Sequence, residues 1–236
     1  MKTPIRITEQ QLHNIIINTV NRTLKEAFMP TFSTAMLSQI SSFSQQVKYC
    51  TEQLGQPVGN GSSRTVFQID DKRVLKLAKN QKGLDQNEVE GEDDWYKSNY
   101  SIFPKVFGKD KYYRWLISEY VLPANKEDFQ HCFGITFEQW LEVIKKFNEW
   151  HRNTMLVRSK LSDRYVQQLV EENENIGEIE DFIANYTSFK TADLKAIQNY
   201  GLAMRDGDPW IVILDSGLSD EVYNQHYRRG VAQIKR

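Results

Sequence analysis

The sequence predicts an α+β protein with a small antiparallel β-rich lobe, a reduced and mainly helical lobe after it, and a helical extension before both. Apolar residues recur at helical spacing over residues 8–28 and again after residue 136. Between these regions, short runs of β-prone residues are separated by turn residues. We therefore expect a helical extension over residues 1–54, a β-rich lobe over 55–122 and a helical lobe over 123–236.

The composition limits the classes of function. The chain has 236 residues, of which 40% are hydrophobic, and this is enough to build a core. Its formal net charge of −1 provides no overall field for nucleic acid or an anionic membrane, so we expect neither as a partner. Cys50 and Cys132 make no disulfide framework, and neither they nor the histidines have metal-ligand spacing. With no leader segment and no membrane-length apolar run, we expect a soluble protein in the cytoplasm, or in a particle assembled there.

The first expected element is an amphipathic helix over residues 8–28. Thr8 and Gln11 match a capping box at its start, and Pro30 stops it. A second apolar pattern predicts another helix through about residue 50. Two interpretations of these helices are open: they pack on the rest of the chain as a brace, or they offer an apolar stripe to a protein partner.

A glycine loop follows and leads into a predicted β-hairpin. Gly59 and Gly61 lack Cβ atoms, so the backbone there can bend sharply and approach phosphate groups closely. Two β-prone runs after these glycines predict the two strands. On the second strand, the side chain of Lys76 points away from Leu75 and Leu77. The hairpin can thus aim an ammonium group at phosphates under the loop, although an ordinary hairpin is the alternative.

The remaining elements follow from the same patterns. In the β-rich lobe we expect a helix over residues 83–97, strands over 102–107 and 112–120, and a turn over 108–111 between these strands. In the helical lobe we expect helices over residues 137–150, 161–170 and 176–186, a strand over 211–214 and a terminal helix from Asp220.

Polar residues of a recurring chemical kind are spread along this framework. They are the acidic cluster Glu88, Glu90 and Glu92, then Asp193 with Asn199, and finally Asp215. Any one acid of the cluster has the alternative of lying on a solvated helix face. Asp215 follows four β-prone apolar residues and precedes a turn, so its carboxylate should emerge at a strand end. Mg²⁺ prefers such hard oxygen ligands, and an ordinary turn aspartate is the alternative.

Taken in order, these segments resemble motifs of the protein-kinase-like superfamily. The glycine-rich loop corresponds to VGNGSSRTVF, with Arg64 where the third glycine usually stands, and the lysine strand corresponds to RVLKLA. The helix whose glutamate pairs with the lysine corresponds to QNEVEGE, and the hinge to SEYVL. The catalytic loop corresponds to ADLKAIQN and the metal motif to LDSG. The resemblance spans roughly residues 57–217.

The resemblance implies a bilobal fold that binds ATP under the glycine loop. Lys76 would contact the phosphates, and Glu90, or Glu88 as the alternate, would hold its ammonium group. The backbone from Glu119 to Val121 would bind adenine. Three valines would sandwich the adenine ring, namely Val58, Val66 and Val74.

The resemblance also implies residue roles in metal binding and catalysis. Asn199 and Asp215 would hold Mg²⁺. Asp193 would accept or orient the proton of the acceptor hydroxyl, and Lys195 would steady the phosphate in transfer. The implied reaction transfers the γ-phosphate of ATP to a hydroxyl group, most directly a Ser or Thr side chain of a protein.

Several departures from the family pattern keep other functions open. Thr191 and Ala192 stand where histidine and arginine are usual, and the segment from Asp193 to Asn199 is one residue longer. Ser216 replaces a phenylalanine, and little chain follows it for gripping a peptide. The alternatives are an inactive pseudokinase that acts as a binding module, and a small-molecule kinase. The early segment ITEQQLHNIIINTVNRTLKEA also resembles leader segments of phage proteins, which would place such a module in a virion.

Overall fold

The structure, a computed structural model, describes residues 32–92, 100–152, 158–186, 188–189, 191–214 and 220–226. The helix predicted over residues 8–28 lies outside these ranges. The chain divides into two compact units, Met1–Gly55 and Gln56–Arg236, and each is described by itself.

The described residues of the first unit, 32–55, form two helices, α2 (Thr34–Gln39) and α3 (Phe43–Leu54), where the sequence predicted one helix through about residue 50. The backbone of Ile40 is extended, with φ −81° and ψ 115°, and this ends α2. Ser42 precedes α3 at the N-cap position, which serine favours. Apolar spacing continues through the break, so periodicity alone could not reveal it.

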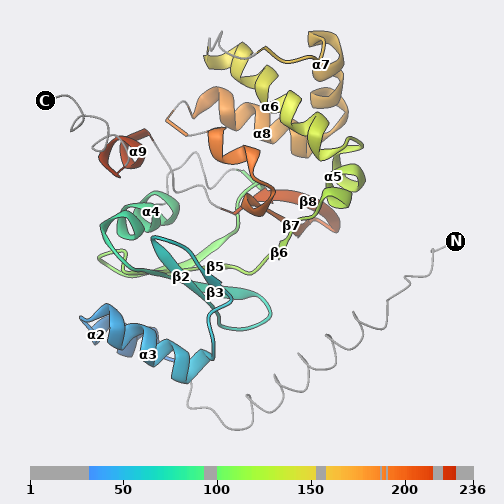
Figure 1. Cartoon of the computed structure of the whole chain (residues 1–236). Helices are drawn as coiled ribbons and strands as arrows, with labels where there is room; N and C mark the ends of the chain where they lie inside the picture. The colour runs from blue at the N-terminus through green and yellow to red at the C-terminus, as the bar shows by residue number, and fades with distance from the viewer. Residues whose placement is uncertain are drawn as a thin grey trace, which may run out of the picture. The chain divides into compact units, whose positions relative to one another are not determined.

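The second unit begins with a five-stranded antiparallel sheet of strand order β1-β2-β3-β5-β4 (Figure 1). Its elements are β1 (Gly59–Asn60), β2 (Arg64–Gln68), β3 (Arg73–Ala78), helix α4 (Gln81–Gly91), β4 (Val106–Lys109) and β5 (Trp115–Glu119). Val66 of β2 and Leu116 of β5 both stand opposite Lys76 of β3, so these three side chains share one face of the sheet. Leu75 and Leu77 point to the other face, as the alternation predicted.

Two strand boundaries differ from the sequence prediction. β4 begins at Val106 rather than at residue 102, because Ile102 and Phe103 are buried in the core of the helical part. β5 begins at Trp115 rather than at residue 112, because a turn precedes it. The Asp110 carboxylate fixes this turn by accepting hydrogen bonds from the Tyr112 N–H at 3.0 Å and from Arg114 Nε at 2.8 Å.

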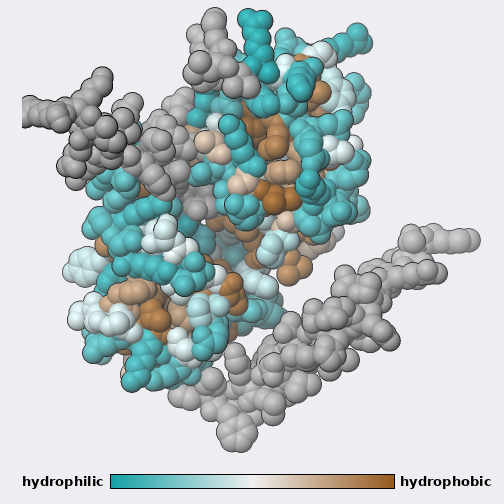
Figure 2. Space-filling model, viewed as in Figure 1, coloured by the Kyte–Doolittle hydropathy of each residue, from teal (hydrophilic) through white to brown (hydrophobic). Residues whose placement is uncertain are grey.

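The rest of the second unit is mainly helical, as predicted. Its helices are α5 (Lys126–Phe133), α6 (Phe137–Arg152), α7 (Asp163–Glu172) and α8 (Glu174–Asn185). A second antiparallel sheet consists of β6 (Leu122–Pro123), β7 (Tyr200–Arg205) and β8 (Asp208–Ile213). Figure 2 shows hydrophobic side chains between the helices of this part and hydrophilic ones over most of its visible outer face. Helix α5 and strands β6 and β7 were not predicted.

A buried arginine ties the sheet part to the helical part. The guanidinium of Arg205 in β7 bonds both carboxylate oxygens of Glu119 in β5, at 2.9 and 2.8 Å. Arg205 Nε also donates to the carbonyl of Ser101 at 3.0 Å. Burial raises the pKa of Glu119, but its bonds to Arg205 and to the Lys105 N–H outweigh this and lower it. The ion pair is therefore formed at neutral pH.

The last described helix, α9 (Asp220–His226), packs against α4. Nε2 of His226 lies 2.6 Å from Oδ2 of Asp85. Within the ranges given above, no helix combines the length and the apolar character that crossing a membrane requires.

Candidate active site

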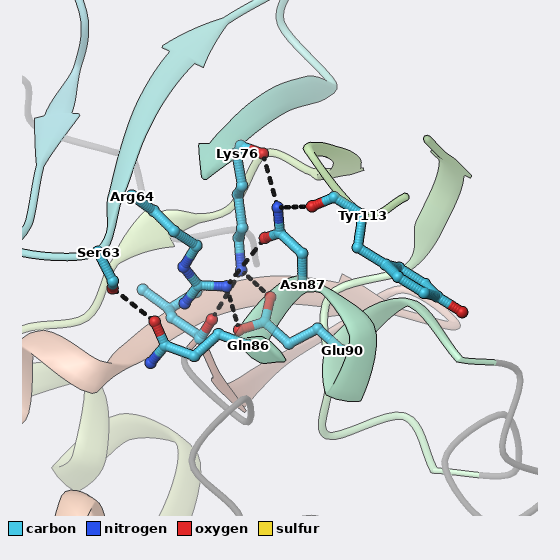
Figure 3. A network of polar contacts seen from close by, with 8 residues as sticks. Ser63, Arg64, Lys76, Gln86, Asn87, Glu90 and Tyr113 are labelled. Carbon is cyan, nitrogen blue, oxygen red and sulfur yellow. Dashed lines mark hydrogen bonds and ion pairs between the residues drawn. The ribbon is translucent and has the colours of Figure 1, made fainter. Parts of the chain in front are cut away.

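Three charged side chains form a buried cluster where β2, β3 and α4 meet (Figure 3). Nζ of Lys76 lies 2.6 Å from Oε2 of Glu90, and Nη1 of Arg64 lies 2.7 Å from Oε1 of Glu90. None of the three side chains is more than 12% exposed. Glu88 and Glu92 of the same helix are exposed. Of the three acids that the sequence offered as partners of Lys76, the structure therefore selects Glu90.

The electrostatics of this cluster keep Glu90 ionised. Burial raises the pKa of a carboxyl group, because it disfavours the charged form. Arg64 and Lys76 oppose this with their charges and hydrogen bonds, and the pKa of Glu90 falls from 4.5 to about 2. The carboxylate is therefore charged at neutral pH and can hold both cations.

Close packing and side-chain amides place helix α4 against the sheet. A Cβ atom on Gly83 would lie 2.2 Å from the carbonyl oxygen of Ser63, so only glycine allows this approach. The Asn87 amide donates to the Tyr113 carbonyl at 2.8 Å and to the Lys76 carbonyl at 3.4 Å. The helix that carries Glu90 is thereby fixed to the edge of β2 and to β3.

The cluster also reaches the helical part. Nζ of Lys76 donates to the carbonyl of Leu214, the residue after β8, at 3.1 Å. The Leu214 N–H in turn donates to the carbonyl of Asn199 at 2.8 Å. Asp215, the expected magnesium ligand, is the next residue and lies outside the described residues, so its role stays a prediction. The lysine is nevertheless in contact with the segment that leads directly to Asp215.

The predicted catalytic loop consists of two 3₁₀ helices, Thr191–Lys195 and Ile197–Asn199. Nδ2 of Asn199 donates to the carbonyl of Asp193 at 2.8 Å, so the two ends of the loop meet despite its length. Among the described residues, Oδ1 of Asn199 accepts no hydrogen bond, and its role as a metal ligand stays a prediction. Lys195 is exposed.

A buried hydrogen-bond chain supports this loop, and no pattern in the sequence predicted it. The Tyr200 hydroxyl donates to the carbonyl of Leu194 at 2.7 Å and accepts from Trp140 Nε1 at 2.9 Å. Tyr200, Leu194 and Trp140 are fully buried. Burial raises the pKa of Tyr200, with a small opposing effect from Trp140, so the hydroxyl stays protonated and keeps donating.

We expect Tyr200→Phe to destabilise the protein by about 1–3 kcal/mol, because it leaves the Leu194 carbonyl and the Trp140 N–H buried without their partner. Urea unfolding measures this. The control is Tyr112→Phe, at a side chain that is 63% exposed, which should change the unfolding free energy by less than about 0.5 kcal/mol. Equal stabilities of the two variants would contradict the support assigned to Tyr200.

The glycine loop is a tight turn between β1 and β2. The N–H of Gly61 donates to the Arg64 carbonyl at 2.9 Å. From the end of β3, Nζ of Lys79 donates to the Gly61 carbonyl at 2.6 Å, and Nδ2 of Asn80 donates to the Ser62 carbonyl at 3.1 Å. The loop is therefore held by the strand that carries Lys76.

The segment from Glu119 to Val121 joins the two parts of the second unit. The N–H groups of Glu119 and Tyr120 donate to the carbonyls of Lys105 and Lys72, each at 2.7 Å. Among the described residues, the Val121 N–H has no acceptor. Of the backbone N–H groups in this segment, those of Glu119 and Tyr120 are therefore already bonded within the protein.

The valines expected around adenine differ in exposure. Val74 is buried, Val66 is half-buried and Val58 is 57% exposed. Gly59 stands opposite Val66 in the register.

Gly201 of β7 is a further residue of the site that was not predicted from the sequence. A Cβ atom there would lie 2.9 Å from Cγ2 of Val121, so glycine lets β7 approach the segment from Glu119 to Val121.

The place of α4 between β3 and β4 and the ion pair of Lys76 with Glu90 agree with what the resemblance implied. The structure confirms the predicted α+β class, with an antiparallel sheet followed by a mainly helical part. No protein-family model and no curated protein matches the chain.

Three similar solved structures are of aminoglycoside phosphotransferases. They are APH(2'')-Ib bound to ADP, a ternary complex of streptomycin, ATP and APH(2'')-IIa, and APH(2'')-IIia with GDP and kanamycin. Their sequence identities are 14%, 16% and 14%, each with a TM-score of 0.33. The matches cover 76%, 76% and 72% of this chain and 80%, 80% and 71% of the other chains. Likeness at this level carries no argument about activity, so the function is argued from the site itself.

Proposed function

We propose that the chain is an ATP- and Mg²⁺-dependent phosphotransferase that acts on a hydroxyl group. One observation carries the proposal: the Lys76 ammonium is held by buried Glu90 and also touches the carbonyl of Leu214, next to Asp215. Phosphoryl transfer needs positioning and charge neutralisation rather than covalent help from the protein. A fixed cation at the carbonyl that precedes a candidate metal ligand in the chain can supply both.

The other residues take the following roles in this proposal. The Oδ1 atom of Asn199 and the carboxylate of Asp215 bind Mg²⁺, which neutralises phosphate charge when bound. Asp193 orients the acceptor hydroxyl, and the exposed Lys195 steadies the phosphate in transfer. The Val121 N–H donates to the base, since it has no acceptor among the described residues.

Nucleotide binding is tested by thermal unfolding with and without Mg-ATP. Because a ligand that binds only the folded state stabilises it, we expect the melting temperature to rise, by the equivalent of about 2.7 kcal/mol at a hundredfold excess over Kd. No shift with ATP or GTP, with or without Mg²⁺, would count against the proposal.

The acceptor class is tested by phosphate transfer in two arms. One arm offers Ser/Thr protein substrates, and the other offers small polyhydroxylated molecules, among them streptomycin and kanamycin from the complexes named above. Transfer in either arm supports the enzyme and names its acceptor class. A thermal shift without transfer in either arm would favour a binding module. Thr191 and Ala192, which stand where the family pattern has histidine and arginine, are the sequence feature that favours this alternative.

A further inference from the structure

The position of Arg64 sets this chain apart from the glycine-rich pattern that it resembles. A glycine there would contribute no side chain, whereas Arg64 contributes a guanidinium that is buried and lies 2.7 Å from Glu90 Oε1. The other oxygen of the same carboxylate, Oε2, bonds Lys76 at 2.6 Å. Because groups on two different strands bind its two oxygens, the Glu90 carboxylate is held against rotation about the Cγ–Cδ bond.

Ser63, the residue before Arg64, also bonds helix α4. Ser63 Oγ donates to Oε1 of Gln86 in α4 at 2.5 Å, one helical turn before Glu90. Nη1 of Arg64 also contacts Oδ1 of Asn87 at 3.5 Å. Two consecutive residues at the end of the glycine loop therefore bond the same face of α4 (Figure 3). The loop and the helix that carries Glu90 are held together as one piece.

We propose that Arg64 is a positioning residue, which turns the Glu90 carboxylate so that Oε2 holds the Lys76 ammonium in place. The expected effect of Arg64 on catalysis rests on the proposed function, whereas the contact between Arg64 and Glu90 is present without any nucleotide. Arg64 acts on Lys76 through Glu90. Because Arg64 directly follows the glycine loop, the position of Lys76 also depends on the position of that loop.

The first test measures the chemical reactivity of the Lys76 amine and needs no nucleotide. Acylation of lysines by an N-hydroxysuccinimide ester is followed residue by residue with mass spectrometry. In Arg64→Met, the carboxylate can rotate away and the ammonium group is less firmly held, so we expect Lys76 to react faster, by about tenfold. Loss of the Arg64 charge alone would act in the opposite direction, because it favours the protonated, unreactive form of Lys76. Arg64→Lys keeps a cation within reach of Oε1 and should restore part of the protection.

Two controls separate positioning from a general loss of structure. Arg114→Met removes another partly buried arginine of the sheet part, which bonds Asp110 at 2.8 and 2.9 Å, and it should leave Lys76 reactivity unchanged. In a Glu90→Gln background, Arg64→Met should not make Lys76 react any faster, because the group through which it acts is already altered. Unchanged or slower reaction of Lys76 in the single variant Arg64→Met, or an acceleration that persists without the Glu90 carboxylate, would overturn the proposal.

The second test measures steady-state transfer. We expect Arg64→Met to lower kcat by about tenfold or more, since a misplaced phosphate-binding group costs rate more than binding, with a smaller change in the KM for ATP. Equal kcat values for Arg64→Met and wild type would overturn the positioning role while leaving the phosphotransferase intact. If wild type transfers no phosphate but Arg64→Met still exposes Lys76 to acylation, the proposed function fails and the contact assigned to Arg64 stands.

Discussion

Replacing Lys76 with alanine is expected to lower phosphate transfer by about a thousandfold or more, because in the proposed function it removes a preorganised cation from the reacting phosphates. The fold should survive. Glu90 keeps its bond to Arg64 at 2.7 Å, so the substitution leaves no buried carboxylate without a cation. We therefore expect a loss of stability of no more than about 1–2 kcal/mol. Transfer is measured with radiolabelled ATP, and stability by urea unfolding.

The matched control is Lys72→Ala, at an exposed lysine in the turn between β2 and β3. It removes the same charge from the same sheet without touching the cluster, and it should keep wild-type turnover. Wild-type turnover in Lys76→Ala would show that Lys76 has a different role. Equal losses in both variants would indicate a nonspecific charge effect.

The parts of the site that were predictable are those in which a short-range pattern fixes a direction. Alternation along β3 separates Lys76 from Leu75 and Leu77, and the register shows this separation. On α4, residues two apart point to different faces of the helix, so Glu90 differs from Glu88, and of these two only Glu90 is buried. Neither result needs knowledge of distant contacts.

The parts that were missed depend on pairs far apart in the chain. Arg64 meets Glu90, and Arg205 meets Glu119, across 26 and 86 positions of sequence. Tyr200 meets Trp140 across 60 positions. The local spacing of apolar residues does not reveal such pairs. An arginine or tyrosine within a predicted strand looks like any other strand residue in the sequence. Short elements such as β6 were missed for a different reason, because two residues carry no period at all.

The largest expected effect on stability comes from Glu90→Ala. It leaves Arg64 and Lys76 buried beside each other with their shared carboxylate gone, and a broken buried ion pair costs about 3–5 kcal/mol. Glu88→Ala is the matched control, since Glu88 is an exposed acid of the same helix and its removal should cost less than about 0.5 kcal/mol. Urea unfolding of both variants at neutral pH measures the difference. Equal unfolding free energies would contradict the view that the cluster holds α4 on the sheet.

The same ion pairs predict how stability depends on pH. The pKa of Glu90 is lowered in the folded protein from 4.5 to about 2, so the folded state binds this proton less readily than the unfolded chain. The stabilising contribution is therefore complete above the ordinary value of 4.5 and is lost as the pH falls through about 2. Glu90→Gln has no such proton to bind. We expect the gap in unfolding free energy between wild type and Glu90→Gln to be constant near neutral pH and to shrink by about half or more near pH 3. A gap that stays constant down to that pH would mean that the carboxylate does not carry the charge that holds Arg64 and Lys76.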